Sequence, residues 1–245
     1  MTVFPTSEDA TTIINAAAVE VGLTPVTDPY SSSNAAFVEL RNMLNTAGRE
    51  ISRMFDWQTI LKDGTIAITS TDDGDYDIPT DYLSMVANTA WDTTNRRPVM
   101  GPVTAKDWAF LTARDIASIN YWYFRIQGNK FKFYPNNPVG ANAAIIYQYK
   151  SAYWVLKSDN TTYQKTVMTG TDKPLFDSLL MSRYLKLKWL QAKQFDTTDA
   201  QNDFNEQFTL MTGADVPGYV LDASGRSPHL YLDAYNNVLD TGYGS

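Results

Sequence analysis

The sequence predicts an α+β protein in which N- and C-terminal helices form an antiparallel helical bundle, with an inserted β-rich subdomain and an extended C-terminal arm. Apolar residues recur at helical spacing near both ends and alternate with polar residues in the middle, and the helical periodicity stops after Gly213. Neither helical part can fill a core alone, so both are expected to join in one bundle. The expected parts are the bundle (1–57 and 173–213), the β-rich insertion (58–172) and the arm (214–245).

Two helices are expected in the N-terminal part of the chain. The first covers about 8–21, with Ser7 as its N-cap and Gly22 as its stop. The second covers about 34–55, where apolar residues recur at spacings of three and four, as in a helix packed nearly parallel to another. These apolar residues are Phe37, Leu40, Leu44, Ala47, Ile51 and Met54.

The middle of the chain changes to a period of two, which is typical of strands. The expected strands are 65–69, 76–78, 124–126, 131–133 and 143–156, and a short helix at 105–113 is capped by Thr104 with Asp107. Gln127-Gly128-Asn129-Lys130 is expected to close a hairpin, because a Gly-Asn centre suits a primed turn. Around this hairpin we expect an alternation of inward Trp122, Phe124 and Ile126 with outward Tyr121, Tyr123 and Arg125.

Two further helices are expected in the C-terminal part. One starts at Lys173 with Pro174 in its first turn, and the other runs from Thr198 to Gly213. The first of these helices carries a basic stripe, which is made of Arg183, Lys186, Lys188 and Lys193. This stripe is a candidate interface with DNA phosphates or with an acidic partner, and the alternative is a solvated helix face.

The arm after Gly213 combines acidic charge with scattered aromatic residues. Four Asp and one Arg give 214–245 a net charge of −3, out of −7 for the whole chain. A segment without its own core becomes ordered mainly by lying on something else, and a neighbouring subunit is the simplest candidate. The arm residues Tyr219, Tyr231 and Tyr235 are therefore candidate interface residues.

The composition argues against most catalytic chemistry. The chain has no cysteine and one histidine, His229, which excludes thiolate nucleophiles and metal sites built from cysteines or several histidines of one chain. We therefore expect no enzyme activity, no cofactor and no metal. The N-terminus shows no secretory signal, and no stretch approaches the ~18 apolar residues of a membrane span, so synthesis in a cytoplasm and no membrane contact are expected.

Three features leave alternatives open. The acidic cluster Asp72, Asp73, Asp75 and Asp77 suits calcium or a glycosidase pair, or else a solvated turn with an Asp-Gly step. His229 is either a general base or an interface or solvent-exposed residue, and no activated nucleophile is identifiable. The aromatic stretch 121–134 suits either a sugar-binding platform or a core with an interface.

One segment resembles a known family. Tyr76 to Leu111 reads YDIPTDYLSMVANTAWDTTNRRPVMGPVTAKDWAFL, and it follows Phe55-Asp56-Trp57 at the end of a long helix. This succession resembles the head-to-tail adaptor proteins of tailed bacteriophages, also called head-completion, neck or tail tubular proteins. The residues that carry the resemblance are Trp57, Trp91, Asp92, Pro98, Gly101, Pro102 and Trp108. We expect Trp91 and Trp108 to pack around the turn at 98–102.

The resemblance implies a structural protein of the virion, at the head-tail junction. It would form a ring, usually of twelve copies, beneath the portal protein, extend the DNA channel and dock the next tail or nozzle protein. DNA would then be passing cargo, which an acidic protein suits because a negative lumen repels phosphates, and no small-molecule substrate is implied. The alternative is a carbohydrate-binding or glycan-hydrolysing tail component, suggested by the Asp cluster and the aromatic residues.

Overall fold

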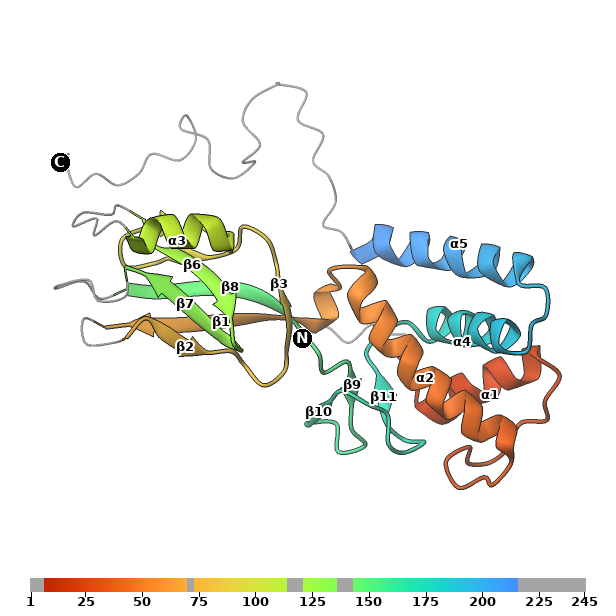
Figure 1. Cartoon of the computed structure of the whole chain (residues 1–245). Coiled ribbons are helices and arrows are strands. Elements are labelled where there is room, and N and C mark those ends of the chain that lie inside the picture. Colours follow the sequence, from red (N-terminus) through yellow and green to blue (C-terminus); the bar gives the residue numbers. More distant parts are fainter. Residues whose placement is uncertain (1–6, 70–72, 114–120, 136–142, 216–245) are drawn as a thin grey trace, which may run out of the picture.

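The fold was examined in a computed structural model, which describes residues 7–69, 73–113, 121–135 and 143–215 (Figure 1). These residues form an α+β structure, as predicted. Its helices are α1 (Ala10–Glu20), α2 (Ala35–Met54), α3 (Ala105–Ala113), α4 (Ser178–Ala192) and α5 (Thr198–Asp215). Its strands are β1 (Leu61–Ile68), β2 (Asp75–Asp77), β3 (Tyr82–Met85), β4 (Trp91–Asp92), β5 (Arg97–Pro98), β6 (Tyr123–Gln127), β7 (Lys130–Tyr134), β8 (Ala143–Ser151), β9 (Val155–Leu156), β10 (Tyr163–Gln164) and β11 (Lys173–Pro174).

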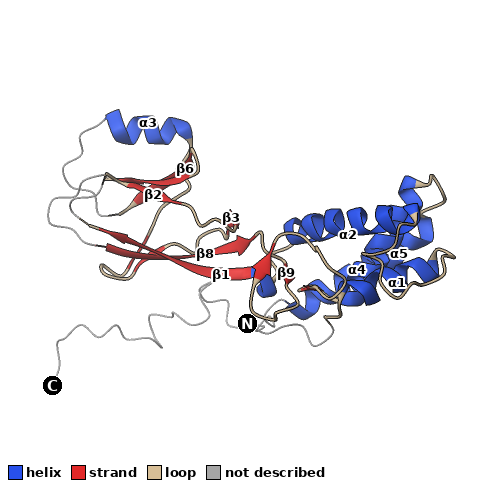
Figure 2. Ribbon diagram, turned by 90° about the horizontal axis from the view of Figure 1, so that it is seen from below, coloured by secondary structure: helices blue, strands red, loops and turns tan. Residues whose placement is uncertain are grey.

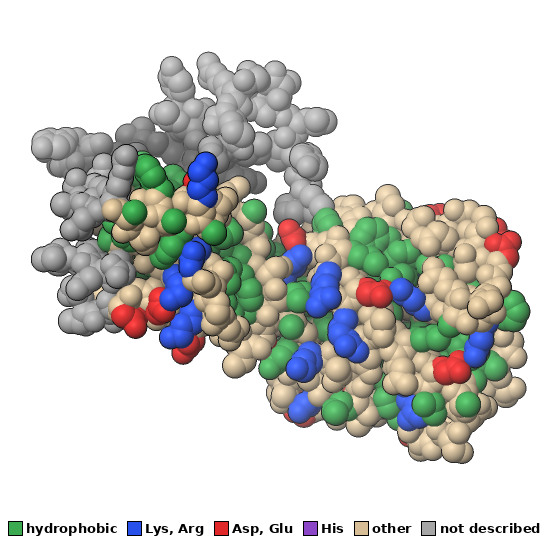
Figure 3. Space-filling model, viewed as in Figure 1, with side chains coloured by type: hydrophobic (Ala, Val, Ile, Leu, Met, Phe, Trp, Pro, Cys, Tyr) green, Lys and Arg blue, Asp and Glu red, His purple; other side chains and the backbone are tan. Residues whose placement is uncertain are grey.

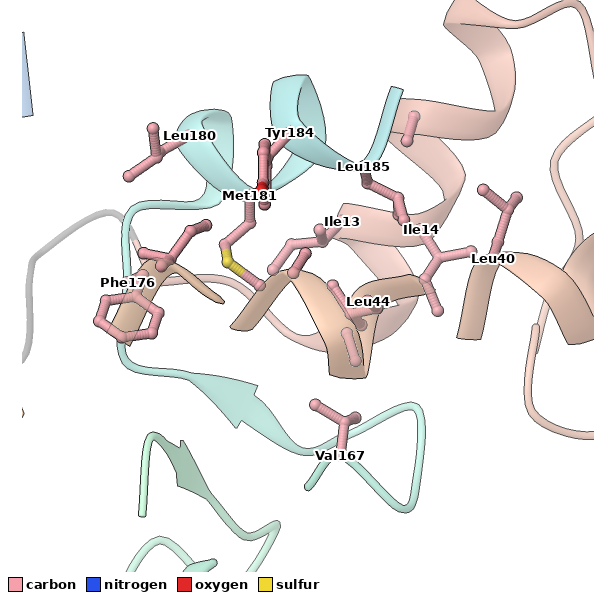
Figure 4. Packing of buried hydrophobic residues seen from close by; sticks show 14 of the residues in the cluster. Ile13, Ile14, Leu40, Leu44, Val167, Phe176, Leu180, Met181, Tyr184 and Leu185 are labelled. Atoms are coloured by element: carbon pink, nitrogen blue, oxygen red, sulfur yellow. The ribbon is translucent and has the colours of Figure 1, made fainter. Parts of the chain in front are cut away.

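The helices α1, α2, α4 and α5 surround one apolar core at one end of the molecule, and the two larger sheets lie at the other end (Figures 1 and 2). Helix α4 is the central helix, since it contacts α1, α2 and α5. Figure 4 shows its Met181 and Leu185 among Ile13, Ile14 and Leu44 of the neighbouring helices. Because α4 buries side chains on more than one face, its apolar residues do not form the single stripe of a surface helix.

Several buried residues between β8 and α4 pack into the helical core, among them Trp154, Leu175 and Phe176. Trp154 is fully buried in this core, where a Cβ on Gly48 of α2 would lie 2.1 Å from its ring. The strand expected to reach 156 ends at Ser151, and Pro174 lies in β11, paired with β9, rather than in a helix. Helix α4 begins only at Ser178, where the Asp177 carboxylate caps it by accepting from the Leu180 N–H at 2.8 Å.

The β part consists of two sheets that pack face to face around a second apolar core, as Figure 2 shows in layers. The first sheet has the order β1-β8-β4-β5, with β3 also paired to β8, and the second has the order β2-β7-β6. After β5 the chain runs beside β6, where the Met100 N–H donates to the Trp122 carbonyl at 2.8 Å. The sheets are therefore connected along the β5 and β6 side, while β1 and β2 are the edges on the other side.

The predicted hairpin is confirmed as β6 and β7. Both central residues, Gly128 and Asn129, have positive φ angles of 62° and 60°, as a primed turn requires. Trp122 and Phe124 are buried as expected, but Ile126 is 38% exposed. Ile126 lines a cleft of about 250 Å³ together with Val99, Gly101 and Pro102, which accounts for its exposure.

The ends of the helices differ slightly from the predictions. Asp9 caps α1 instead of the expected Ser7, so this helix begins two residues later than predicted, and Asn34 caps α2, which begins one residue later than predicted. Helix α5 continues through Gly213 to Asp215, so the arm begins after Asp215. Over the residues that the structure describes, no helix is both long and apolar enough to cross a membrane.

Candidate interface and structural motif

The basic stripe predicted on α4 is tied to the other helices of the same chain. Lys186 Nζ lies 3.0 Å from the Glu20 carboxylate of α1, and Lys188 Nζ lies 2.7 Å from Glu50 of α2. The remaining two members are paired as well: Lys193 with Glu39 of α2 at 2.7 Å, and Arg183 with the Asp203 carbonyl of α5 at 2.9 Å. The four cations therefore hold α4 to its three neighbouring helices.

The Lys188 pair is the most interconnected of these contacts. Burial opposes the charged form of Lys188, but the hydrogen bonds to Glu50 and Tyr184 and the Coulombic interactions with both groups together outweigh it and raise the pKa of the lysine. Burial likewise acts to raise the pKa of Glu50, and hydrogen bonds from Lys188 and the Tyr184 hydroxyl lower it overall.

The helical face in Figure 3 shows Lys and Arg side chains mixed with acidic and uncharged ones. This mixture offers little of the dense positive surface that binds phosphates.

The family-like segment contains a buried carboxylate, Asp92, which is 1% exposed. Its Oδ1 accepts from the backbone N–H groups of Thr94 and Asn95 at 3.0 and 3.2 Å. Its Oδ2 accepts from the Asn95 amide at 2.6 Å and from the Trp122 indole N–H at 3.1 Å. One side chain thus fixes the turn between β4 and β5 and joins the first sheet to the residue before β6.

Gly101 permits a close approach between the two sheets. Its φ is +153°, and a Cβ at this position would lie 2.5 Å from the Phe124 carbonyl oxygen of β6. A side chain would therefore push the connecting segment away from β6. Pro102 follows through a cis peptide bond.

Trp91 lies in the first sheet, whereas Trp108 lies on α3 beside the second sheet. Trp91 lies beside Pro98 in the sheet register but is 41% exposed, on the outer face next to Ile146. Trp108 lies on α3 against the other sheet, where the Arg125 guanidinium stands 4.9 Å from its ring centroid. Trp91 is thus available for contacts outside the subunit, whereas Trp108 attaches α3 to β6.

Trp57 anchors the passage from α2 to β1. It is 1% exposed, and its indole N–H donates to the Ile51 carbonyl at 2.7 Å. Its ring packs against Phe176 and Phe208 at centroid distances of 5.7 and 5.8 Å. Trp57 therefore ties the end of α2 to the residues before α4 and to α5.

A polar network between the helical and β parts was not singled out from the sequence. The Asp81 carboxylate accepts from Lys62 at 2.5 Å, Ser151 at 2.8 Å and Tyr149 at 3.0 Å. Burial acts to raise the pKa of Asp81, but these hydrogen bonds outweigh it and lower that pKa overall. Asp81 lies within the segment that resembles the adaptor family, and this position was the one feature of the sequence that could have pointed to the network.

The comparison with protein families decides the identity. Residues 9–227 match the family model described as the SU10 adaptor protein. The chain belongs to this family. A search of curated proteins finds no match.

Membership of the SU10 adaptor family confirms the resemblance to phage head-to-tail adaptors. It makes the chain a structural adaptor of a bacteriophage particle, which interacts with other head and tail proteins and implies a non-enzymatic role. The match spans both apolar cores and all seven motif residues. The motif residues with buried or close contacts, such as Asp92 and Gly101, therefore act in the fold of the adaptor.

The described residues of the acidic cluster form an ordinary turn in this SU10 adaptor. Asp75 pairs with Lys132 at 2.6 Å, and Asp73 accepts from the Asp75 N–H at 3.0 Å, as in an ordinary turn. No group of three or more potential metal ligands lies together within the described part of the chain. Asp72, His229, Tyr219, Tyr231 and Tyr235 lie outside the described residues.

Proposed function

We propose that this protein forms a dodecameric ring beneath the portal, extends the DNA channel and docks the tail or nozzle protein. The observation that carries the proposal is the match of residues 9–227 to the SU10 adaptor family, which spans both cores. The helical and β parts lie at opposite ends of an elongated subunit (Figure 1). Such a subunit offers one end to the head and the other to the tail, with its flanks free for neighbours.

A cyclic ring uses heterologous contacts, in which two different surfaces of each subunit meet. Since the cations of α4 are paired within the subunit, they are less suited to this contact than the sequence suggested. The exposed outer face around Trp91 and Ile146 is a better candidate, because both side chains are more than 40% exposed and neighbours in register. Such apolar exposure is typical of surfaces that bind another protein.

DNA is treated in this proposal as cargo that passes through the ring. The net charge of −7 disfavours tight binding of phosphates. The paired cations of α4 add to this effect, because their charge is already balanced by Glu20, Glu39 and Glu50. An acidic lumen would let the duplex slide without sticking.

The proposal is tested by measuring mass in solution with and without the portal protein of the same phage. We expect the portal to recruit this chain into a ring, whose copy number is then counted by electron microscopy of the complex. A Trp91→Ala, Ile146→Ala variant should bind less well, while an exposed pair elsewhere, Val19→Ala with Leu210→Ala, serves as the matched control. A monomer that ignores the portal, and instead binds or cleaves bacterial polysaccharide, would overturn the proposal in favour of a glycan-directed tail component.

A further inference from the structure

Strand β1 is a long edge strand. It spans eight residues and pairs with β8 over its whole length, and within the described part of the chain no other strand pairs with it. By contrast, the opposite side of the β part is closed by hydrogen bonds between the segment after β5 and strand β6. The edge of β1 thus presents a row of backbone groups to whatever lies beside it.

The second half of this edge lacks the usual protection against pairing. Proteins protect edge strands by making them short or by placing proline, bulges or charged side chains on them. Residues 65–68 read Thr-Ile-Ala-Ile, without charge or proline, and pair with β8 in unbroken register. Thr65 and Ala67 are exposed while Ile66 and Ile68 are buried, so an added strand would find one apolar and one polar side. Such an edge in a native protein indicates a partner strand.

The C-terminal arm contains one segment suited to that edge. Residues 229–239 contain neither glycine nor proline, whereas 216–228 contain two of each. Within the suited segment, Leu230, Leu232 and Ala234 alternate with Tyr231, Asp233 and Tyr235. This period of two gives a strand with one apolar face for the sandwich core and one polar face for solvent.

The starting point of the arm favours a neighbouring subunit as the acceptor. The Asp215 carboxylate accepts from the Gln58 N–H at 2.8 Å. Gln58 lies three residues before the start of β1, so the last described residue is held close to the beginning of that strand. Fourteen residues then precede Leu230, and extended they span up to ~48 Å at ~3.4 Å each. The eight residues of β1 cover only ~26 Å at ~3.3 Å each. The arm is therefore long enough for residues 230–235 to reach beyond their own β1 to the β1 edge of a second copy.

We propose that residues 230–235 of one subunit pair as an added strand with the edge of β1 in a second copy. The inference rests on the ring proposed above and specifies how its subunits are linked. Backbone hydrogen bonds supply the affinity, and the buried alternation of Leu230 and Leu232 beside Ile66 and Ile68 supplies the register. This arrangement also protects the edge in the assembled ring.

Disulfide crosslinking tests the pairing cleanly, because the chain has no cysteine of its own. Full-length Thr65→Cys protein is mixed with full-length Tyr231→Cys, Asp233→Cys or Tyr235→Cys protein, assembled with the portal and oxidised. Each chain carries one cysteine, so a mixed disulfide joins two subunits. Thr46→Cys, which replaces an exposed threonine of α2, is the matched acceptor control.

We expect mixed disulfides with Thr65→Cys from one or more of these three polar-face positions. Leu232→Cys should give only the background of the Thr46→Cys control, since its side chain faces the other way. A second pair of variants introduces the same charge on either face: Leu232→Lys should abolish the crosslink through Tyr235→Cys, and Asp233→Lys should preserve it. Alternation between faces is specific to a strand, because a loosely attached arm would crosslink without it.

The outcomes separate this inference from the proposed function. Rings that form without mixed disulfides, or with equal crosslinking from both faces, would overturn the strand exchange and leave the adaptor ring intact. A disulfide seen only within a single chain that carries both Thr65→Cys and Asp233→Cys would also overturn it, in favour of pairing within one subunit. Failure to form any ring with the portal would overturn both.

Discussion

Replacing Asp92 with alanine is expected to destabilise the β part by about 2–4 kcal/mol, because the carboxylate satisfies four donors at once. The Trp122 indole is 7% exposed, so losing its acceptor leaves a buried N–H unpaired; such a group costs about 1–3 kcal/mol. The two backbone N–H groups and the Asn95 amide lie in an exposed turn, where water replaces the carboxylate. Their loss resembles the loss of a helix cap, at about 1 kcal/mol.

The assay is urea unfolding of the full-length protein, followed by tryptophan fluorescence and far-ultraviolet circular dichroism. The matched control is Asp63→Ala, an exposed aspartate of β1 whose carboxylate accepts one hydrogen bond, from the Gln148 amide at 3.0 Å. That control is expected to change the free energy of unfolding by less than about 0.5 kcal/mol. Asp92→Asn should lower the free energy of unfolding by an amount between those of Asp92→Ala and Asp63→Ala. Its amide oxygen can accept from one pair of donors, but its NH₂ group faces the other pair.

A specific result would refute this reasoning. If Asp92→Ala and Asp63→Ala lowered the free energy of unfolding equally, the hydrogen bonds to Trp122 and the turn would not stabilise the β part. A normal stability in Asp92→Asn would show that the carboxylate charge and its second acceptor oxygen are unimportant. Trp122→Phe in the Asp92→Ala background supplies the complementary check, since removing the orphaned N–H should recover part of the loss.

Three other changes have expected outcomes. Gly48→Ala should lower the free energy of unfolding by about 1–3 kcal/mol in thermal denaturation, because the new Cβ would lie 2.1 Å from the Trp154 ring; Gly213→Ala, with open space around it, should not. Deleting 216–245 should leave the monomer folded, with an unchanged dichroism spectrum, but weaken docking to the portal or ring; a melted monomer contradicts this. The lowered pKa of Asp81 stabilises the fold above the unfolded pKa of about 3.9, and that stability is lost as the pH falls through the folded pKa. Asp81→Asn should therefore lose less stability than the wild type between pH 5 and acid, in urea unfolding at each pH.

The parts of the fold that follow from local chemistry could be predicted from the sequence. The β6–β7 hairpin is specified by Gly128 and Asn129, which adopt the positive φ angles that its turn needs. The seam of α2 was also readable, because Leu40, Leu44 and Ile51 repeat at helical spacing and are all fully buried. In each case, the residues that make up the signal lie close to one another in the sequence.

Features that depend on distant partners were beyond the sequence. Pro174 reads as a helix start, yet it lies in β11 because Val155 pairs with it and the Leu175 N–H donates to the Trp154 carbonyl at 2.9 Å. The basic residues of α4 were visible as a stripe, but Glu20 and Glu50 lie more than a hundred residues away in the chain. Periodicity places a side chain on a face and leaves its partner on another helix unspecified.

For the candidate interface, the structure adds what the sequence pattern lacks: the partners and the exposure of each side chain. A stripe of cations predicts a binding surface, and the structure shows that Lys186, Lys188 and Lys193 form ion pairs with α1 and α2 of the same subunit, so their role in an interface stays a prediction. Trp91 was chosen as a packing residue and is instead exposed. Resemblance identified the correct segment, and only the burial of each side chain separates the residues that build the fold from those that face outward.

The junction between the helical and β parts is fixed by several ion pairs and hydrogen bonds. Strands β1 and β8 pair over eight positions up to this junction, where Lys150 meets Asp56 at 2.9 Å and Lys62 meets Asp81 at 2.5 Å. On the other side, the Asp215 carboxylate accepts from the Gln58 N–H. Bending the two parts against each other would strain the Lys150–Asp56 ion pair and the bond between Asp215 and Gln58. Because charge-assisted bonds are directional and stronger than neutral ones, these contacts favour one fixed angle between the helical and β parts.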